Sequence, residues 1–128
     1  MKKVLLSFIL VTFLAGCSSI SKFIPSKFDN VEFGKLVELN VVAELKDPTE
    51  SWCNPVIINQ MNYRSLWLVT YSKYRLNDNI AEIYKQIHGI TKELKERENP
   101  SDAYCRIKRQ SIHKITTDVL QVFGSRKA

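Results

Sequence analysis

The strongest pattern of apolar and polar positions lies between residues 79 and 98. Five apolar side chains recur there at spacings of three and four residues: Ile80, Ile83, Ile87, Ile90 and Leu94. This is the spacing of one face of an α-helix, and lysines and glutamates fill many of the remaining positions. The pattern predicts an amphipathic helix that buries these five side chains, is capped at Asn79 and ends before Asn99-Pro100.

Two neighbouring segments have the start signals of helices. Asn54-Pro55 opens the first, because the residue before a proline avoids helical backbone angles and proline fits the first helical position. No glycine or further proline follows up to residue 75, so this helix is expected to be long. Ser101 caps the last helix, which runs to about Gly124. Its expected inner stripe consists of Tyr104, Ile107, Ser111, Ile115, Val119 and Val122.

The segment from residue 31 to residue 45 contains two competing patterns. Four apolar residues have helical spacing: Leu36, Leu39, Val42 and Ala43. The apolar positions on either side of Glu38 and Asn40 also alternate with polar ones, which is typical of a strand. Asp29 precedes Glu32 by three residues, as in a helix-opening capping box, and this arrangement favours a helix.

Four helices with short connections predict an all-α fold, a small antiparallel bundle over residues 28–128. The second and fourth helices of such a bundle begin at the same end. Cys53 lies just before the second helix and Cys105 lies in the first turn of the fourth, so the topology brings the two cysteines together. We expect them to form a disulfide, as an even pair in an exported domain usually does. A reactive pair is the alternative, although the two residues lack the C-x-x-C spacing of redox motifs.

The N-terminus has a different character from the rest of the chain. Lys2 and Lys3 precede an apolar run over residues 4–14, which is short for a transmembrane helix of about 20 residues and fits a signal sequence. Leu14-Ala15-Gly16-Cys17 follows directly and resembles the lipobox of bacterial lipoproteins. The resemblance implies that residues 1–16 are a cleaved signal peptide and that the Cys17 thiol carries lipid. Residues 17–27 then form a lipidated tether.

The same resemblance implies a location. A chain lipidated at Cys17 is anchored to membrane lipid in the bacterial cell envelope. A single acyl chain binds a membrane only marginally, whereas two or three acyl chains on the cysteine give stable attachment. Ser18 is similar to the pattern of outer-membrane lipoproteins, whereas an aspartate at that position tends to retain lipoproteins on the inner membrane. We therefore expect attachment to the outer membrane, with the domain facing the periplasm.

Charge and motifs exclude several kinds of function. The 128 residues carry a formal charge of +6, which falls to about +4 without Lys2 and Lys3. So small a charge suits a membrane surface or an acidic protein, but it does not indicate nucleic-acid binding. There is no glycine-rich phosphate loop, no H-E-x-x-H and no G-x-S-x-G. His88 and His113 lie on separate predicted helices, so we expect no metal, no cofactor and no enzymatic activity, although acids from different helices could converge.

The second predicted helix carries an aromatic stripe. Tyr63, Trp67, Tyr71 and Tyr74 share one face, and a second face consists of Ile57, Met61, Ser65, Leu68 and Ser72. The aromatic stripe is either part of the core or a site for a partner, since exposed tryptophan and tyrosine are favoured at interfaces. For a partner site, Trp67, Tyr71 and Tyr63 are the candidates. Arg106 and Arg109 on the last predicted helix would form a basic rim. Trp52, next to Cys53, is a further candidate because the disulfide would hold its loop rigid.

The leading hypothesis is a non-enzymatic lipoprotein that binds or tethers another envelope protein. One alternative is a secretion accessory, because type II secretion pilotins resemble this chain in being lipid-anchored, mostly helical and closed by a disulfide to the last helix. That resemblance is architectural and carries no binding residue. A second alternative is a phage-encoded or accessory envelope lipoprotein that acts in lysis or exclusion. A small periplasmic enzyme is the least favoured.

Overall fold

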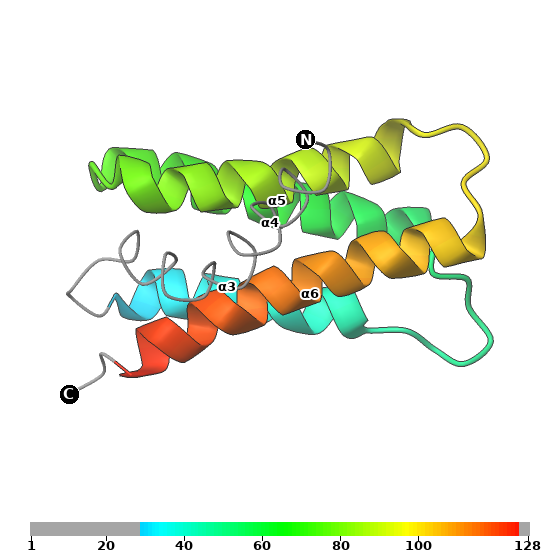
Figure 1. The fold of residues 1–128 in the computed structure, drawn as a ribbon, viewed down its shortest axis with the longest axis horizontal. Helices are drawn as coiled ribbons and strands as arrows, with labels where there is room; N and C mark the ends of the chain where they lie inside the picture. Colours follow the sequence, from blue (N-terminus) through cyan, green and yellow to red (C-terminus); the bar gives the residue numbers. More distant parts are fainter. Residues whose placement is uncertain (1–28, 126–128) are drawn as a thin grey trace, which may run out of the picture.

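The computed structural model describes residues 29–125, which form an antiparallel bundle of four helices (Figure 1). The helices are α3 (Asn30–Glu44), α4 (Pro55–Tyr74), α5 (Asp78–Glu96) and α6 (Asp102–Ser125). This confirms the predicted all-α bundle and its disulfide between Cys53 and Cys105. The expected signal peptide, the tether and the lipidated Cys17 lie outside the described residues.

Most of the predicted helix starts are confirmed. The Asp29 carboxylate accepts hydrogen bonds from the amides of Val31 and Glu32, which settles the segment 31–45 as helix. Asn54 caps α4, with Pro55 as its first residue. Helix α5 differs: it starts at Asp78, behind an Asn77 whose side chain makes no capping bond, so the predicted cap at Asn79 is wrong. The reason is local, because the turn that ends α4 already bonds the Asn77 amide to the Ser72 carbonyl at 2.9 Å.

The core forms where the four helices face one another. Helix α4 packs most extensively on α5 and α3 on α6, while α3–α4 and α5–α6 contacts close the ring. The predicted inner residues of α3 are all buried, and so are Ile80, Ile83, Ile87 and Leu94 on α5. Ile90 is half-buried against the same core. Within residues 29–125, no helix is both long enough and apolar enough to span a bilayer.

The inner face of α6 is shifted from the predicted stripe, although Tyr104, Ile115 and Val122 still pack, half-buried, against the core. Its buried residues are Cys105, Arg109, Ile112, Thr116, Val119 and Phe123, of which only Val119 was predicted. Ile107 is 57% exposed. The disulfide requires Cys105 to face inward, and this turns the helix by about one residue, or 100°, from the orientation that apolar side chains alone suggest. Two polar residues, Arg109 and Thr116, occupy the inner face because both find backbone carbonyl acceptors there.

Candidate interaction surface

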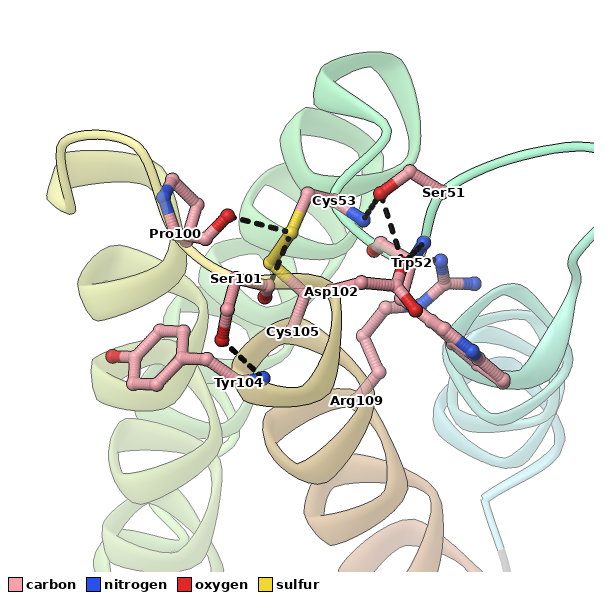
Figure 2. The surroundings of a disulfide bond; sticks show 9 residues. All are labelled: Ser51, Trp52, Cys53, Pro100, Ser101, Asp102, Tyr104, Cys105 and Arg109. Atoms are coloured by element: carbon pink, nitrogen blue, oxygen red, sulfur yellow. Dashed lines mark hydrogen bonds between the residues drawn. A yellow bond between two sulfur atoms is a disulfide. The ribbon is translucent and has the colours of Figure 1, made fainter.

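The disulfide end of the bundle holds the loop between α3 and α4 in place (Figure 2). Cys53 and Cys105 are joined across a Cα–Cα distance of 5.3 Å. The Asp102 carboxylate accepts hydrogen bonds from the Trp52 amide at 2.8 Å and the Ser51 hydroxyl at 3.0 Å. The bond from the Trp52 amide, followed by that from Ser51, holds the pKa of Asp102 below its usual value. The loop is thus tied to the start of α6 by a covalent bond and by a carboxylate.

Arg109 is a buried structural residue and not part of a basic rim, which corrects the sequence prediction. Its side chain is completely buried, and burial lowers the pKa of the guanidinium. The guanidinium donates to the carbonyls of Val42, Ala43, Leu45 and Trp52 at 2.6–3.2 Å. Three of these carbonyls lie at the end of α3, where helical hydrogen bonds are missing. Arg109 therefore caps α3 from a different helix.

Trp52 and Arg106 are also poor candidates for one continuous site. The Trp52 ring is half-buried between the Arg109 guanidinium, 4.8 Å from its centroid, and the Lys46 ammonium, at 5.5 Å. Arg106 is exposed, but it lies on α6, which is diagonal to α4 in the bundle (Figure 1). The predicted combination of α4 aromatics with a rim of Arg106 and Arg109 does not exist as one surface.

The aromatic stripe of α4 lies at the edge of the core, with Trp67 packed against it and Tyr63 facing solvent. Tyr63 is 70% exposed, while Trp67 and Tyr71 are half-buried and stack on each other with ring centroids 4.8 Å apart. The Lys35 ammonium lies 5.5 Å from the Trp67 ring, and the Tyr71 hydroxyl donates to Asp29 at 2.8 Å. The core instead takes Ile58, Met61, Ser65, Leu68, Val69 and Ser72 from this helix. Of the two readings of the stripe, the structure therefore favours the outward-facing one.

The rest of this surface was missed in the sequence. We define the α4 outer face as Val56, Asn59, Gln60, Tyr63, Leu66, Trp67 and Thr70, which are exposed except for half-buried Trp67. None of these residues is charged, and the whole segment 51–77 contains no aspartate or glutamate. Most exposed side chains of α5 are charged, including Glu82, Lys85 and Lys92. The detectable signal was therefore the lack of charge on an outward helix face.

Two shallow hollows of similar volume lie along the α4 outer face. Val56, Gln60 and Tyr63 line one hollow of about 410 Å³, together with Asn59 and Arg64. Leu66, Val69, Thr70, Lys73 and Tyr74 line a second hollow of about the same volume. Arg64 stands at the border with α3 and pairs with Glu38. Apolar side chains of a partner could therefore enter the first hollow, between Val56 and Tyr63.

Two groups of polar side chains between the helices are paired with one another. The Ser65 hydroxyl lies 3.1 Å from His88 Nδ1, which resembles a nucleophile and its base, but Ser65 is completely buried and closed to a substrate. On the other side of the bundle, the Asn40 side-chain amide donates to the Thr116 hydroxyl. The Asn40 backbone carbonyl oxygen lies 3.2 Å from His113 Nδ1. Within residues 29–125, no three histidine, cysteine or acidic side chains are grouped to hold a metal ion.

One titratable group is exceptional. Glu32 is buried at the start of α3, and burial, followed by the nearby charge of Asp29, raises its pKa to about 7. Tyr84 and Arg75 oppose this rise. Burial also raises the Asp29 pKa, but hydrogen bonds from the Glu32 amide and the Tyr71 hydroxyl outweigh it, so the net shift is downward. Two acids three residues apart thus have opposite shifts.

Comparison with known proteins gave no relative: no protein-family model, no curated protein and no solved structure matches this chain.

Proposed function

We propose that this protein is a non-enzymatic lipoprotein of the cell envelope, anchored through Cys17 at the periplasmic face of the outer membrane. It binds or tethers another envelope protein through the α4 outer face. The observation that carries the proposal is an exposed helix face with tyrosine, tryptophan, valine and leucine and no charged residue. Depletion of charge and enrichment in aromatics distinguish the cores of protein interfaces from ordinary surface.

Rigidity of the surface supports binding. Helix α4 has 20 residues and is therefore about 30 Å long, and its inner face is fixed by the core. The disulfide and the Asp102 bonds fix the loop that leads into it. A rigid surface loses little conformational entropy when a partner binds, so more of the contact energy appears as affinity.

The anchor supports the same role. A lipidated Cys17 confines the domain near one membrane, and confinement raises its effective concentration towards other proteins of that membrane. Metabolic labelling with a palmitate analogue tests the anchor. We expect label on the wild-type protein and none on Cys17→Ala, and undiminished labelling of the variant would remove the lipoprotein assignment.

Tyr63→Ala tests the binding surface. Tyr63 is the centre of the α4 outer face and has little contact with the core, so the variant should fold normally. Loss of a central aromatic anchor commonly costs about 2 kcal/mol or more, or about 30-fold in affinity. We expect the variant to lose capture of a partner from detergent-solubilised envelope by that factor.

Ile107→Ala is the matched control, because Ile107 is an exposed apolar residue on α6, away from the α4 outer face. Capture by this variant should equal that of the wild type. Equal capture by Tyr63→Ala and wild type would place the binding surface elsewhere. The identity of the captured protein separates the narrower alternatives: a secretin subunit indicates a pilotin-like accessory, and a phage lysis or tail protein indicates a phage role.

A further inference from the structure

The turn between α4 and α5 exposes four consecutive residues, of which Arg75 forms an ion pair with Asp29. We define the α4–α5 corner as Lys73, Tyr74, Arg75 and Leu76, all of which are exposed. Tyr74 is 83% exposed and Leu76 is 89% exposed, more than any other large hydrophobic residue that the structure describes. An aromatic and an aliphatic side chain thus project into solvent, each directly following a cation in the sequence.

The backbone of the corner makes the leucine more unusual. The Leu76 amide donates to the Lys73 carbonyl at 3.0 Å and the Asn77 amide donates to the Ser72 carbonyl at 2.9 Å, which is the Schellman pattern that ends a helix. Leu76 has φ 56°, in the left-handed region that glycine or asparagine usually occupies at this position. The backbone at Leu76 is strained, yet the leucine side chain buries almost none of its apolar surface. Stability of the fold does not explain that choice.

The corner lies at the end of the bundle where the proposed anchor joins the fold. Asp29 precedes α3, and its carboxylate accepts from the Tyr71 hydroxyl and lies 3.6 Å from Arg75 Nε. Residues 17–28 connect Cys17 to this point and span at most about 40 Å. Helix α6 also ends at this end of the bundle, opposite the disulfide (Figure 1). This step rests on the proposed lipid anchor.

The chemistry of the corner matches an anionic phospholipid surface. Lys73 has no acidic partner within ion-pair distance among the described residues, Arg75 pairs with Asp29, and the exposed Asp78 follows in the first turn of α5. Cations near a membrane are attracted to anionic headgroups, tyrosine is favoured at the headgroup level, and an exposed leucine gains by entering the acyl boundary. A membrane surface also explains why the corner lies at the end of the bundle nearest the proposed anchor, whereas a protein partner would not require that position.

We propose that the α4–α5 corner rests on the anionic surface of the membrane that holds the lipid anchor. Leu76 and Tyr74 enter the interfacial layer, and Lys73 and Arg75 contact lipid phosphates. This contact orients the bundle with its disulfide end away from the membrane. The α4 outer face then stands above the bilayer, accessible to a second envelope protein.

A spin label at position 76 tests the proposal in the full lipidated protein. Cys53 and Cys105 are bonded to each other and Cys17 is acylated in the proposal, so Leu76→Cys supplies a single free thiol. The purified protein is reconstituted in vesicles of phosphatidylcholine with phosphatidylglycerol. The measured quantity is the ratio of the label's collision rate with oxygen to its collision rate with a water-soluble nickel complex. We expect this ratio to be several-fold higher for the label at position 76 than for a label at Ile107→Cys. In pure phosphatidylcholine vesicles, or with Lys73→Glu, this difference should shrink.

Three outcomes would overturn the proposal. A label at position 76 that meets the nickel complex as freely as the label at position 107, on protein that floats with the vesicles, removes the membrane contact and leaves the anchor intact. Protein that does not float with the vesicles contradicts both the contact and the anchor. Dipolar broadening between labels at position 76 shows that a second copy of the chain covers the corner in place of lipid.

Discussion

At the scale of single residues, two buried ionisable groups differ in whether hydrogen bonds compensate their charge. Arg109 donates to four carbonyl oxygens, so its charge is compensated inside the fold. Glu32 is nearly as buried, but its Oε2 atom has no hydrogen-bond partner among the described residues. An ionised carboxylate without enough donors is expensive in a protein interior, and its pKa rises until the neutral form competes. Glu32 therefore makes the fold sensitive to pH.

Glu32→Gln should change the pH dependence of stability. The folded-state pKa of Glu32 is about 7 against a usual 4.5, so the folded state binds more protons between these values and stability falls as pH rises through them. The variant removes this fall. We expect it to be more stable than wild type by roughly 1–3 kcal/mol near pH 8 and about equal near pH 4.

Urea unfolding at several pH values, followed by circular dichroism, measures this difference. Glu38→Gln is the control, because Glu38 is partly exposed and paired with Lys35 and Arg64, and loss of such surface ion pairs should cost no more than about 1 kcal/mol. Parallel pH profiles for wild type and Glu32→Gln would show that the Glu32 carboxyl does not titrate with unfolding.

At the scale of helices, the two ends of α3 show which features a sequence can predict. Its start is capped by Asp29, the adjacent residue, and that cap was predictable from spacing. Its end is capped by Arg109, which comes from α6 and is 66 residues away from Ala43. No local pattern indicates such a long-range bond, so Arg109 looked like a surface cation. The predicted orientation of α6 was wrong for the same reason. The disulfide and the Arg109 cap, both long-range contacts, decide which face of α6 turns inward.

Arg109→Lys should destabilise the bundle by roughly 3 kcal/mol or more. A lysine keeps the charge, but one ammonium group cannot reach the carbonyls that the planar guanidinium spans, and buried acceptors at the end of α3 are left without donors. Arg106→Lys, at an exposed position on the same helix, should stay within about 0.5 kcal/mol of wild type. Denaturant unfolding compares the two. Equal stability of both variants would mean that the cap does not hold α3.

At the scale of the whole molecule, function depends on which surfaces the bundle leaves outward. The sequence predicted four helices, the disulfide and the aromatic stripe of α4. It could not decide whether Tyr63 and Trp67 face the core, because that depends on where α3 and α5 pack against α4. The structure places the stripe outward, beside Val56 and Leu66 from the same helix. It also separates the stripe from Arg106.

Binding of an envelope protein to the α4 outer face can be observed by photo-crosslinking in cells, with a photoreactive residue placed at Val56, Tyr63 or Leu66. Ile107 on α6 and Lys85 on the charged face of α5 are the control positions. We expect the three α4 positions to give one adduct of the same mass, and the two controls to give none. Adducts at the control positions without any at Tyr63 would contradict the assignment of the α4 outer face as the binding surface.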